Sequence, residues 1–155
     1  MSYQHIFPFF RYAEVLLNYA EALAAATQNP DFTGMKGEVE YTLSPREALN
    51  AVRARYNMPG ITETDYAAFV KRLRNERRVE LAFEGHRFWD IRRWKIGAET
   101  TKVYGLTITP QNDGSFSYVR SVIQQRGWDD RMNYYPIADA ELFKNHNLVQ
   151  NDGWK

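Results

Sequence analysis

The stretch from Arg74 to Trp94 constrains the possible folds of this chain more than any other segment, because charged and bulky apolar residues alternate along it. It contains six arginines, three glutamates and one aspartate, interleaved with phenylalanine and tryptophan. These side chains cannot all face water, and opposite charges three or four positions apart on a helix can pair. We therefore predict a semi-buried network of ion pairs that builds structure, formed by Arg77, Glu80, Glu84, Arg87, Asp90 and Arg93.

The same stretch permits a catalytic interpretation, in which two of Glu76, Glu80 and Glu84 act as the acid and base of a glycosidase. Such enzymes hold two carboxyl groups ~5–9.5 Å apart, which this spacing allows. A general acid must carry its proton near neutral pH, however, and the neighbouring arginines favour ionised carboxylates. The residues therefore favour a structural role, and we expect no enzyme activity.

Other binding chemistries have less support in the sequence. The basic residues of this region suit phosphate groups, but the interleaved acids repel the same groups; the candidates are Lys71, Arg72, Arg74, Arg77 and Arg78. The net charge is only +1, so we expect no nucleic-acid partner. The histidines His5, His86 and His146 lie far apart and match no metal-binding pattern, and the glycines form no phosphate-binding loop. We expect neither a metal nor a cofactor.

Apolar periodicity predicts a mainly α-helical fold with long irregular loops. A helix over 10–27 and a second one that starts at Ser44, whose capping box is completed by Glu47, form an αα-hairpin over 10–57 with a loop of roughly fifteen residues between them. A third helix, capped by Thr64 or Asp65 and running toward Phe83, and a fourth over 86–95 make a pair of helices over 65–95.

The chain changes character after Gly97, where β-branched and aromatic residues alternate. Residues 104–109 and 116–123 predict a β-hairpin, joined by turn residues 110–114, within an irregular region over 98–155 that has one short helix at 140–144. We expect a single domain over 1–155. Only one helical-repeat-like unit is present, and repeat architectures usually need three or more, so we expect a missing remainder.

Three ordered motifs resemble the SusD/RagB-like glycan-binding lipoproteins of Bacteroidetes outer membranes. The first is RYAEVLLNYAEA at 11–22 followed by LNAVRAR at 49–55, and the second is NERRVELAFEGHRFWDIRRW at 75–94. The third combines YPIADAE at 135–141 with NLVQNDGW at 147–154. Only Ala138 departs from the family pattern, where a second proline is usual, so the resemblance covers nearly the whole chain but only the C-terminal part of a typical member.

The resemblance implies a non-catalytic receptor with TPR-like helical hairpins, exposed at the cell surface of the outer membrane. Such a receptor binds an oligosaccharide or another nutrient and passes it to a SusC-like TonB-dependent transporter. The membrane is reached only through an N-terminal lipid anchor that is absent from this chain. The αα-hairpin alone also suits a different class of protein, a stand-alone helical-repeat scaffold for protein–protein interactions.

Sugar rings stack on exposed aromatic side chains, and aromatic residues make up 15% of this chain. Most of them are expected in the core. The best candidates for sugar contacts lie in the hairpin and the irregular region, away from the helical core face: Trp128, Tyr134, Tyr118 and Tyr104. The family motifs do not fix these contacts.

Overall fold

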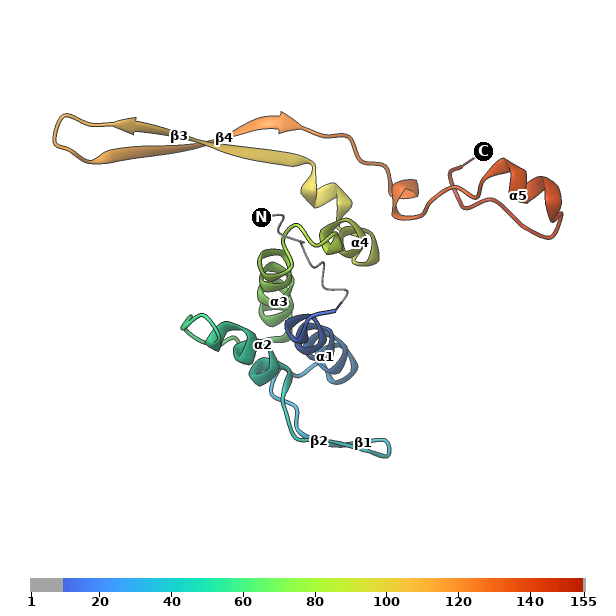
Figure 1. The fold of residues 1–155 in the computed structure, drawn as a ribbon, viewed down its shortest axis with the longest axis horizontal. Helices are drawn as coiled ribbons and strands as arrows, with labels where there is room; N and C mark the ends of the chain where they lie inside the picture. Colours follow the sequence, from blue (N-terminus) through green and yellow to red (C-terminus); the bar gives the residue numbers. More distant parts are fainter. Residues whose placement is uncertain (1–9, 155) are drawn as a thin grey trace, which may run out of the picture. The chain divides into compact units, whose positions relative to one another are not determined.

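The structure is a computed structural model that describes residues 10–154. The chain divides into two compact units, the first ending at His86 and the second beginning at Arg87. Within the described residues there are five α-helices and two separate two-stranded sheets, so the predicted mainly α-helical class is confirmed (Figure 1). The expectation of one domain over 1–155 stays a prediction.

The core of the first unit lies between three helices: α1 (Tyr12–Thr27), α2 (Pro45–Ala54) and α3 (Tyr66–Glu80). Helix α1 packs against both α2 and α3. The apolar residues that recur at three- and four-residue steps on each helix point into this core, which explains why these segments fold as amphipathic helices. The largest fully buried side chains are Leu17, Leu49, Val52, Phe69, Leu73 and Leu81.

The ends of the helices follow the capping chemistry of the sequence. The hydroxyl of Ser44 accepts a hydrogen bond from the backbone N–H of Glu47, and the Glu47 carboxylate accepts one from the backbone N–H of Ser44 at 2.8 Å. This backbone hydrogen bond lowers the pKa of Glu47, because it favours the charged form. Helix α3 is capped by Asp65, which accepts from the N–H of Ala68. Both predicted caps are confirmed, with Asp65 rather than Thr64 at the second.

Two boundaries of the first unit differ from expectation. The loop after α1 contains a small antiparallel hairpin of β1 (Gly34–Lys36) and β2 (Val39–Tyr41), whose turn uses Gly37 at φ +62°. Three-residue strands are too short to show an alternating pattern, so apolar periodicity could not predict them. Helix α3 ends at Glu80, short of Phe83, because the chain turns through positive φ at Phe83 and again at Gly85.

Few residues of the second unit are buried. Helix α4 (His86–Arg93), which starts at the last residue of the first unit, leads into the 3-10 turn η1 (Gly97–Thr100) and then into β3 (Lys102–Pro110) and β4 (Phe116–Gln125). The tail holds η2 (Asp130–Asn133) and α5 (Asp139–Lys144). The predicted β-hairpin is confirmed, and it is longer than expected at both ends.

Candidate functional site

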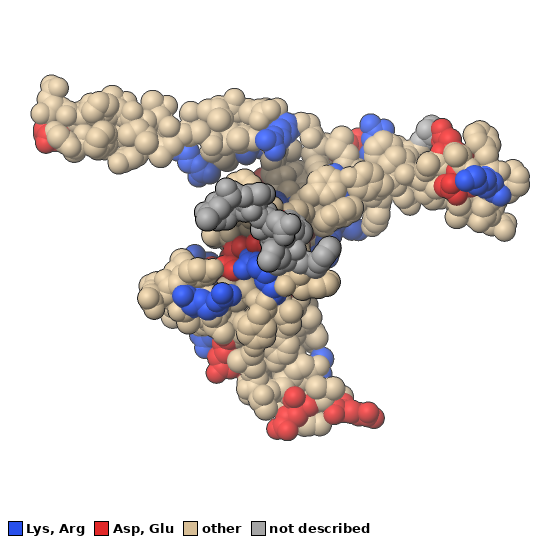
Figure 2. Space-filling model, viewed as in Figure 1, with Lys and Arg blue, Asp and Glu red and all other residues tan. Residues whose placement is uncertain are grey.

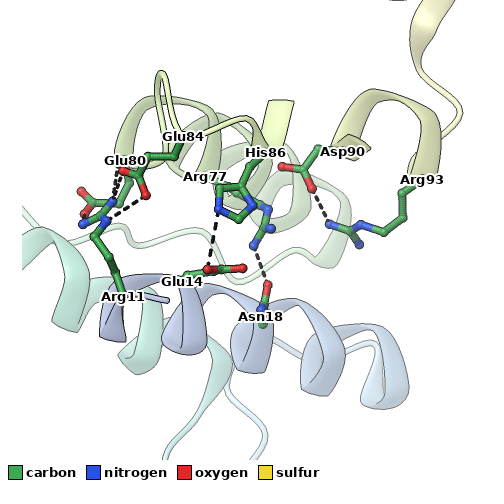
Figure 3. A network of polar contacts seen from close by, with 9 residues as sticks. All are labelled: Arg11, Glu14, Asn18, Arg77, Glu80, Glu84, His86, Asp90 and Arg93. Atoms are coloured by element: carbon green, nitrogen blue, oxygen red, sulfur yellow. Dashed lines mark hydrogen bonds and ion pairs between the residues drawn. The ribbon is translucent and has the colours of Figure 1, made fainter. Parts of the chain in front are cut away.

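The polar network of the first unit is centred on Arg11, which precedes α1. Its Nε and Nη2 donate to the two carboxylate oxygens of Glu84 at 2.9 and 2.7 Å, and its Nη1 donates to Glu80 at 2.8 Å (Figure 3). Nη2 also donates to the backbone carbonyl of Glu80. These hydrogen bonds, first those to Glu84 and then those to Glu80, raise the pKa of Arg11. One guanidinium therefore ties the start of α1 to the end of α3.

Further polar contacts join α1 to the signature stretch. Arg77 donates to the side chain of Asn18 at 2.5 Å, and His86 lies 3.6 Å from the carboxylate of Glu14. The partners come from a segment about sixty to seventy residues earlier in the chain, so spacing along one helix could not have revealed them. Arg11 was missed for this reason, although it is the first residue of the first family motif.

Two further ion pairs each lie within one of the two units. Arg53 of α2 donates to Glu76 of α3 at 2.5 Å and to the carbonyl of Pro59 at 2.8 Å. Within α4, Arg93 pairs with the buried Asp90 at the three-residue spacing that the sequence indicated. Arg87 lies in the first turn of the same helix.

This geometry bears on the glycosidase interpretation. Glu76, Glu80 and Glu84 each accept hydrogen bonds from an arginine, and the arginines hold them at junctions between helices. An acid–base pair needs a carboxyl group that can release and recover a proton beside a substrate. The arrangement supports the structural role that we predicted for the network.

Two of the predicted sugar contacts, Tyr104 and Tyr118, lie on the β3–β4 hairpin and share one of its faces. Cross-strand partners project to the same side of a sheet, and this side alternates along each strand. The register places on this face the pairs Tyr104–Val122, Leu106–Arg120, Ile108–Tyr118 and Pro110–Phe116. The opposite face carries Gly105–Ser121, Thr107–Val119 and Thr109–Ser117. One side of the hairpin is therefore aromatic and aliphatic, and it is exposed.

Arg120 is the charged residue of this apolar face. Its guanidinium carbon lies 3.9 Å from the centre of the Tyr104 ring, close enough for a cation–π contact. Much of the β3–β4 hairpin carries no charged side chain on the side that Figure 2 shows. Among the four pairs from Tyr104–Val122 to Pro110–Phe116, Arg120 is the one charged residue.

The other two predicted contacts occupy different surroundings. Trp128 lies flat against the buried Gly97: a Cβ atom added at that glycine would fall 1.8 Å from the indole ring. One face of Trp128 is therefore used for packing within the unit. Tyr134 is exposed, and Lys95 lies 5.8 Å from its ring centre.

The sequence did not reveal a cluster of aromatic rings between α4 and the tail. Phe88 and Trp89 meet edge to face with ring centres 5.0 Å apart, and the ring of Tyr135 lies 6.1 Å from each of them. All three rings are exposed, and that of Trp89 retains 60% of its accessible surface. The guanidinium of Arg92 lies 3.6 Å from the ring centre of Phe88. Phe88 and Trp89 belong to the stretch for which the sequence predicts a structural role.

A groove of ≈ 680 Å³ lies between α1 and the β1–β2 hairpin, with Tyr19, Leu23, Lys36 and Tyr41 among its lining residues. The hydroxyl of Tyr19 donates to the carbonyl of Leu43, and burial raises the pKa of Tyr19.

Within residues 10–154 no three histidine, aspartate or glutamate side chains gather as a metal site would require. None of the helices described is both long and apolar enough to cross a membrane.

The fold and the motifs agree with comparisons to known proteins. The family model described as SusD family matches residues 2–154. SusD-like protein P2 of Formosa agariphila is 33% identical over 146 residues, which are 92% of this chain and 24% of that protein. A solved SusD-like protein from Bacteroides fragilis is 34% identical, with a TM-score of 0.71 over 96% of this chain and 26% of its own.

A second solved structure, a SusD superfamily protein from Parabacteroides distasonis, shares the fold at a TM-score of 0.57 and 24% identity, with 96% of this chain and 27% of that one covered. The chain thus spans about a quarter of the length of the relatives that it matches. Because the family model covers nearly every residue, and a relative is 33% identical across the same region, this chain belongs to the SusD family.

Proposed function

We propose that this chain is part of a non-catalytic, oligosaccharide-binding component of an outer-membrane nutrient uptake system. Its parent protein would face the cell surface, would be held at the membrane by a lipid anchor and would deliver its ligand to a SusC-like TonB-dependent transporter. The observation that carries this proposal is the match to the SusD family over residues 2–154. SusD-like proteins act in nutrient binding, and in this chain Glu76, Glu80 and Glu84 each accept a hydrogen bond from an arginine.

The exposed aromatic residues of the second unit support the choice of a sugar ligand. A sugar ring presents C–H groups on its faces and hydroxyls at its rim, so it stacks on an exposed ring whose surroundings offer hydrogen-bond donors. The cluster of Phe88, Trp89 and Tyr135 offers such rings, with Arg92 beside them. Tyr104, Tyr118 and Tyr134 remain candidate contacts, whereas one face of Trp128 is already occupied by Gly97.

Affinity electrophoresis of the chain through gels that contain individual polysaccharides tests the proposal. We expect at least one polysaccharide to retard the chain, and Tyr135→Ala to reduce the retardation. Tyr12→Ala is a matched control, because Tyr12 is an exposed tyrosine of the first unit, on α1, and is not a member of the cluster. Absence of retardation by any polysaccharide, in this chain and in a full-length parent alike, would refute the sugar ligand.

The same samples test the absence of catalysis. We expect no release of reducing sugar from any polysaccharide that binds. Release that disappears in Glu80→Gln, while the helical content is unchanged, would show that the ion-paired carboxylates have a catalytic role after all.

A further inference from the structure

Arg92 is the charged residue beside the cluster of Phe88, Trp89 and Tyr135, and its guanidinium carries five N–H donors. Its Nη1 donates to the backbone carbonyl of Phe88 at 2.9 Å. Its Nε is buried and has no hydrogen-bond partner in the part of the chain that the structure describes. Buried donors of this kind are rare in folded proteins, because each one loses its hydrogen bonds to water without replacement. Of the Arg92 nitrogens, Nη1 is therefore the one with a hydrogen-bond acceptor among the described residues.

The surroundings of Arg92 are aromatic rather than acidic. Its guanidinium carbon lies 3.6 Å from the ring centre of Phe88, 5.5 Å from that of Trp128 and 5.7 Å from that of Tyr135. Among residues 10–154 no carboxylate forms an ion pair with it. Asp90, two residues before Arg92, pairs with Arg93, and Asp129, which follows Trp128, pairs with Arg131.

Other arginines of the chain show what the usual arrangement would be. Arg11 uses its Nε and Nη2 to bind both oxygens of Glu84, and Arg53 binds Glu76. Arg131 lies on a ring in the same way as Arg92, 5.0 Å from the centre of Trp154, yet it also has Asp129 as an ion-pair partner at 3.8 Å. Arg92 thus differs from Arg131 in lacking the anion.

Two more cations of the second unit repeat this pattern. Arg120 lies on Tyr104, and Lys95 lies near Tyr134; neither has a carboxylate partner within the described residues. Both rings are candidate sugar contacts. Exposed rings that carry unpaired cations suit a ligand that is both ring-shaped and negatively charged.

We propose that Arg92 and the rings around it bind an anionic group, a carboxylate or a sulfate ester, on an oligosaccharide whose sugar rings stack on Trp89 and Tyr135. This inference rests on the proposed function, and it adds the charge of the ligand. A guanidinium suits both groups, because its planar fork can make two parallel hydrogen bonds to two oxygens of one anion. Since Nε is out of contact with solvent, the anion meets the terminal nitrogens first.

Matched pairs of polysaccharides test the charge of the ligand. Polygalacturonate is compared with its carboxyl-reduced form, and carrageenan with its desulfated form, by affinity electrophoresis and by calorimetry with oligosaccharides cut from each. We expect one anionic form to bind about tenfold or more tightly than its neutral counterpart, the scale of one hydrogen bond to a charged group. Added sodium chloride should weaken that binding, and the pair that responds identifies the anion as carboxylate or sulfate.

Variants of Arg92 assign the effect to this site. Arg92→Gln should remove the preference for the anionic form and the dependence on salt, and Arg92→Lys should keep part of both, because lysine retains the charge but not the fork. Arg131→Gln is the matched control, since it removes a ring-bound arginine that already has an acid partner. Circular dichroism of each variant reports folding, and the salt dependence of the unmodified chain needs no variant at all.

The outcomes separate this inference from the proposed function. Binding of neutral polysaccharides only, binding of anionic ones without salt dependence, or an unchanged preference in a folded Arg92→Gln variant would overturn the anionic site and leave the sugar-binding function standing. If neither this chain nor its full-length parent bound any polysaccharide, charged or neutral, both the anionic site and the proposed sugar-binding function would be refuted.

Discussion

At the scale of single residues, Arg11 is expected to stabilise the fold through its ion pair with Glu80. Its partner Glu80 retains only 9% of its side-chain accessible surface, while Arg11 itself retains 24%. Arg11→Met leaves the Glu80 carboxylate nearly buried without its cation, which costs about 3 kcal/mol, the low end for a broken buried pair because Arg11 is partly solvated. Urea denaturation followed by circular dichroism measures the change in the free energy of unfolding.

Arg72→Met is the control for this prediction. It removes an ion pair of similar length, 3.0 Å to Glu63, but Arg72 is 49% exposed, so water and salt screen the pair. The free energy of unfolding should change much less than in Arg11→Met. Equal losses in the two variants would show that the ion pair of Arg11 contributes no more than the exposed ion pair of Arg72.

The residue scale is also where prediction from sequence was least complete. Spacing along a helix identified Glu80 and Glu84 as ion-pair members and gave the Asp90–Arg93 pair, because those rules describe neighbours within one element. Arg11 lies 69 residues before Glu80, and only packing of α1 on α3 brings the two together. Spacing within one helix could not predict the cluster around Arg92 for the same reason, because Tyr135 comes from the tail and contacts Trp89 of α4.

At the scale of elements, the β3–β4 hairpin exposes an aromatic and aliphatic face to solvent, which is unfavourable. An isolated two-stranded hairpin is marginally stable, and an exposed apolar face tends to associate with other apolar surfaces. We expect Ile108→Thr, which removes an apolar side chain from the aromatic face, to reduce the binding of the dye ANS and the tendency to self-associate. Fluorescence titration and light scattering measure the two effects.

Val119→Thr is the matched control, because Val119 lies on the opposite face with a similar exposure, 60% against 54% for Ile108. It should change both signals less. If Val119→Thr reduced ANS binding and self-association more than Ile108→Thr, the face that carries Val119, and not the aromatic face, would be the one that associates.

Elements were predicted well wherever local chemistry decides the structure. Ser44 with Glu47, and Asp65, set the starts of α2 and α3, and the alternating residues after Gly97 gave the β3–β4 hairpin. The predicted ends of elements were wrong where the conformation of a few residues overrides the apolar pattern. Apolar periodicity continues through Phe83, yet positive φ at Phe83 and Gly85 ends the helical region, and the short β1–β2 strands left no periodic signal.

At the scale of the whole molecule, the buried apolar residues are distributed unequally. Every apolar side chain of the described core lies between Ala13 and Leu81, whereas the second unit buries no large apolar side chain among its described residues. Burial of apolar surface is the main source of stability. The first unit therefore has the means to fold cooperatively, and the second is held by hairpin hydrogen bonds, the aromatic cluster and the packing of Trp128 on Gly97.

A shortened chain that ends at His86 tests this division. We expect it to keep the helical circular dichroism of α1, α2 and α3 and to unfold at nearly the same urea midpoint as the main transition of the whole chain, because its core is complete. In the whole chain, hydrogen exchange should protect amides of these helices far more than amides of β3 and β4, since strands without a buried face open at little cost. A shortened chain that fails to fold would instead show that residues 87–155 complete the core, and that the single domain expected over 1–155 is the correct description. Equal protection of the hairpin and the helices would point the same way, because it requires the two units to unfold as one.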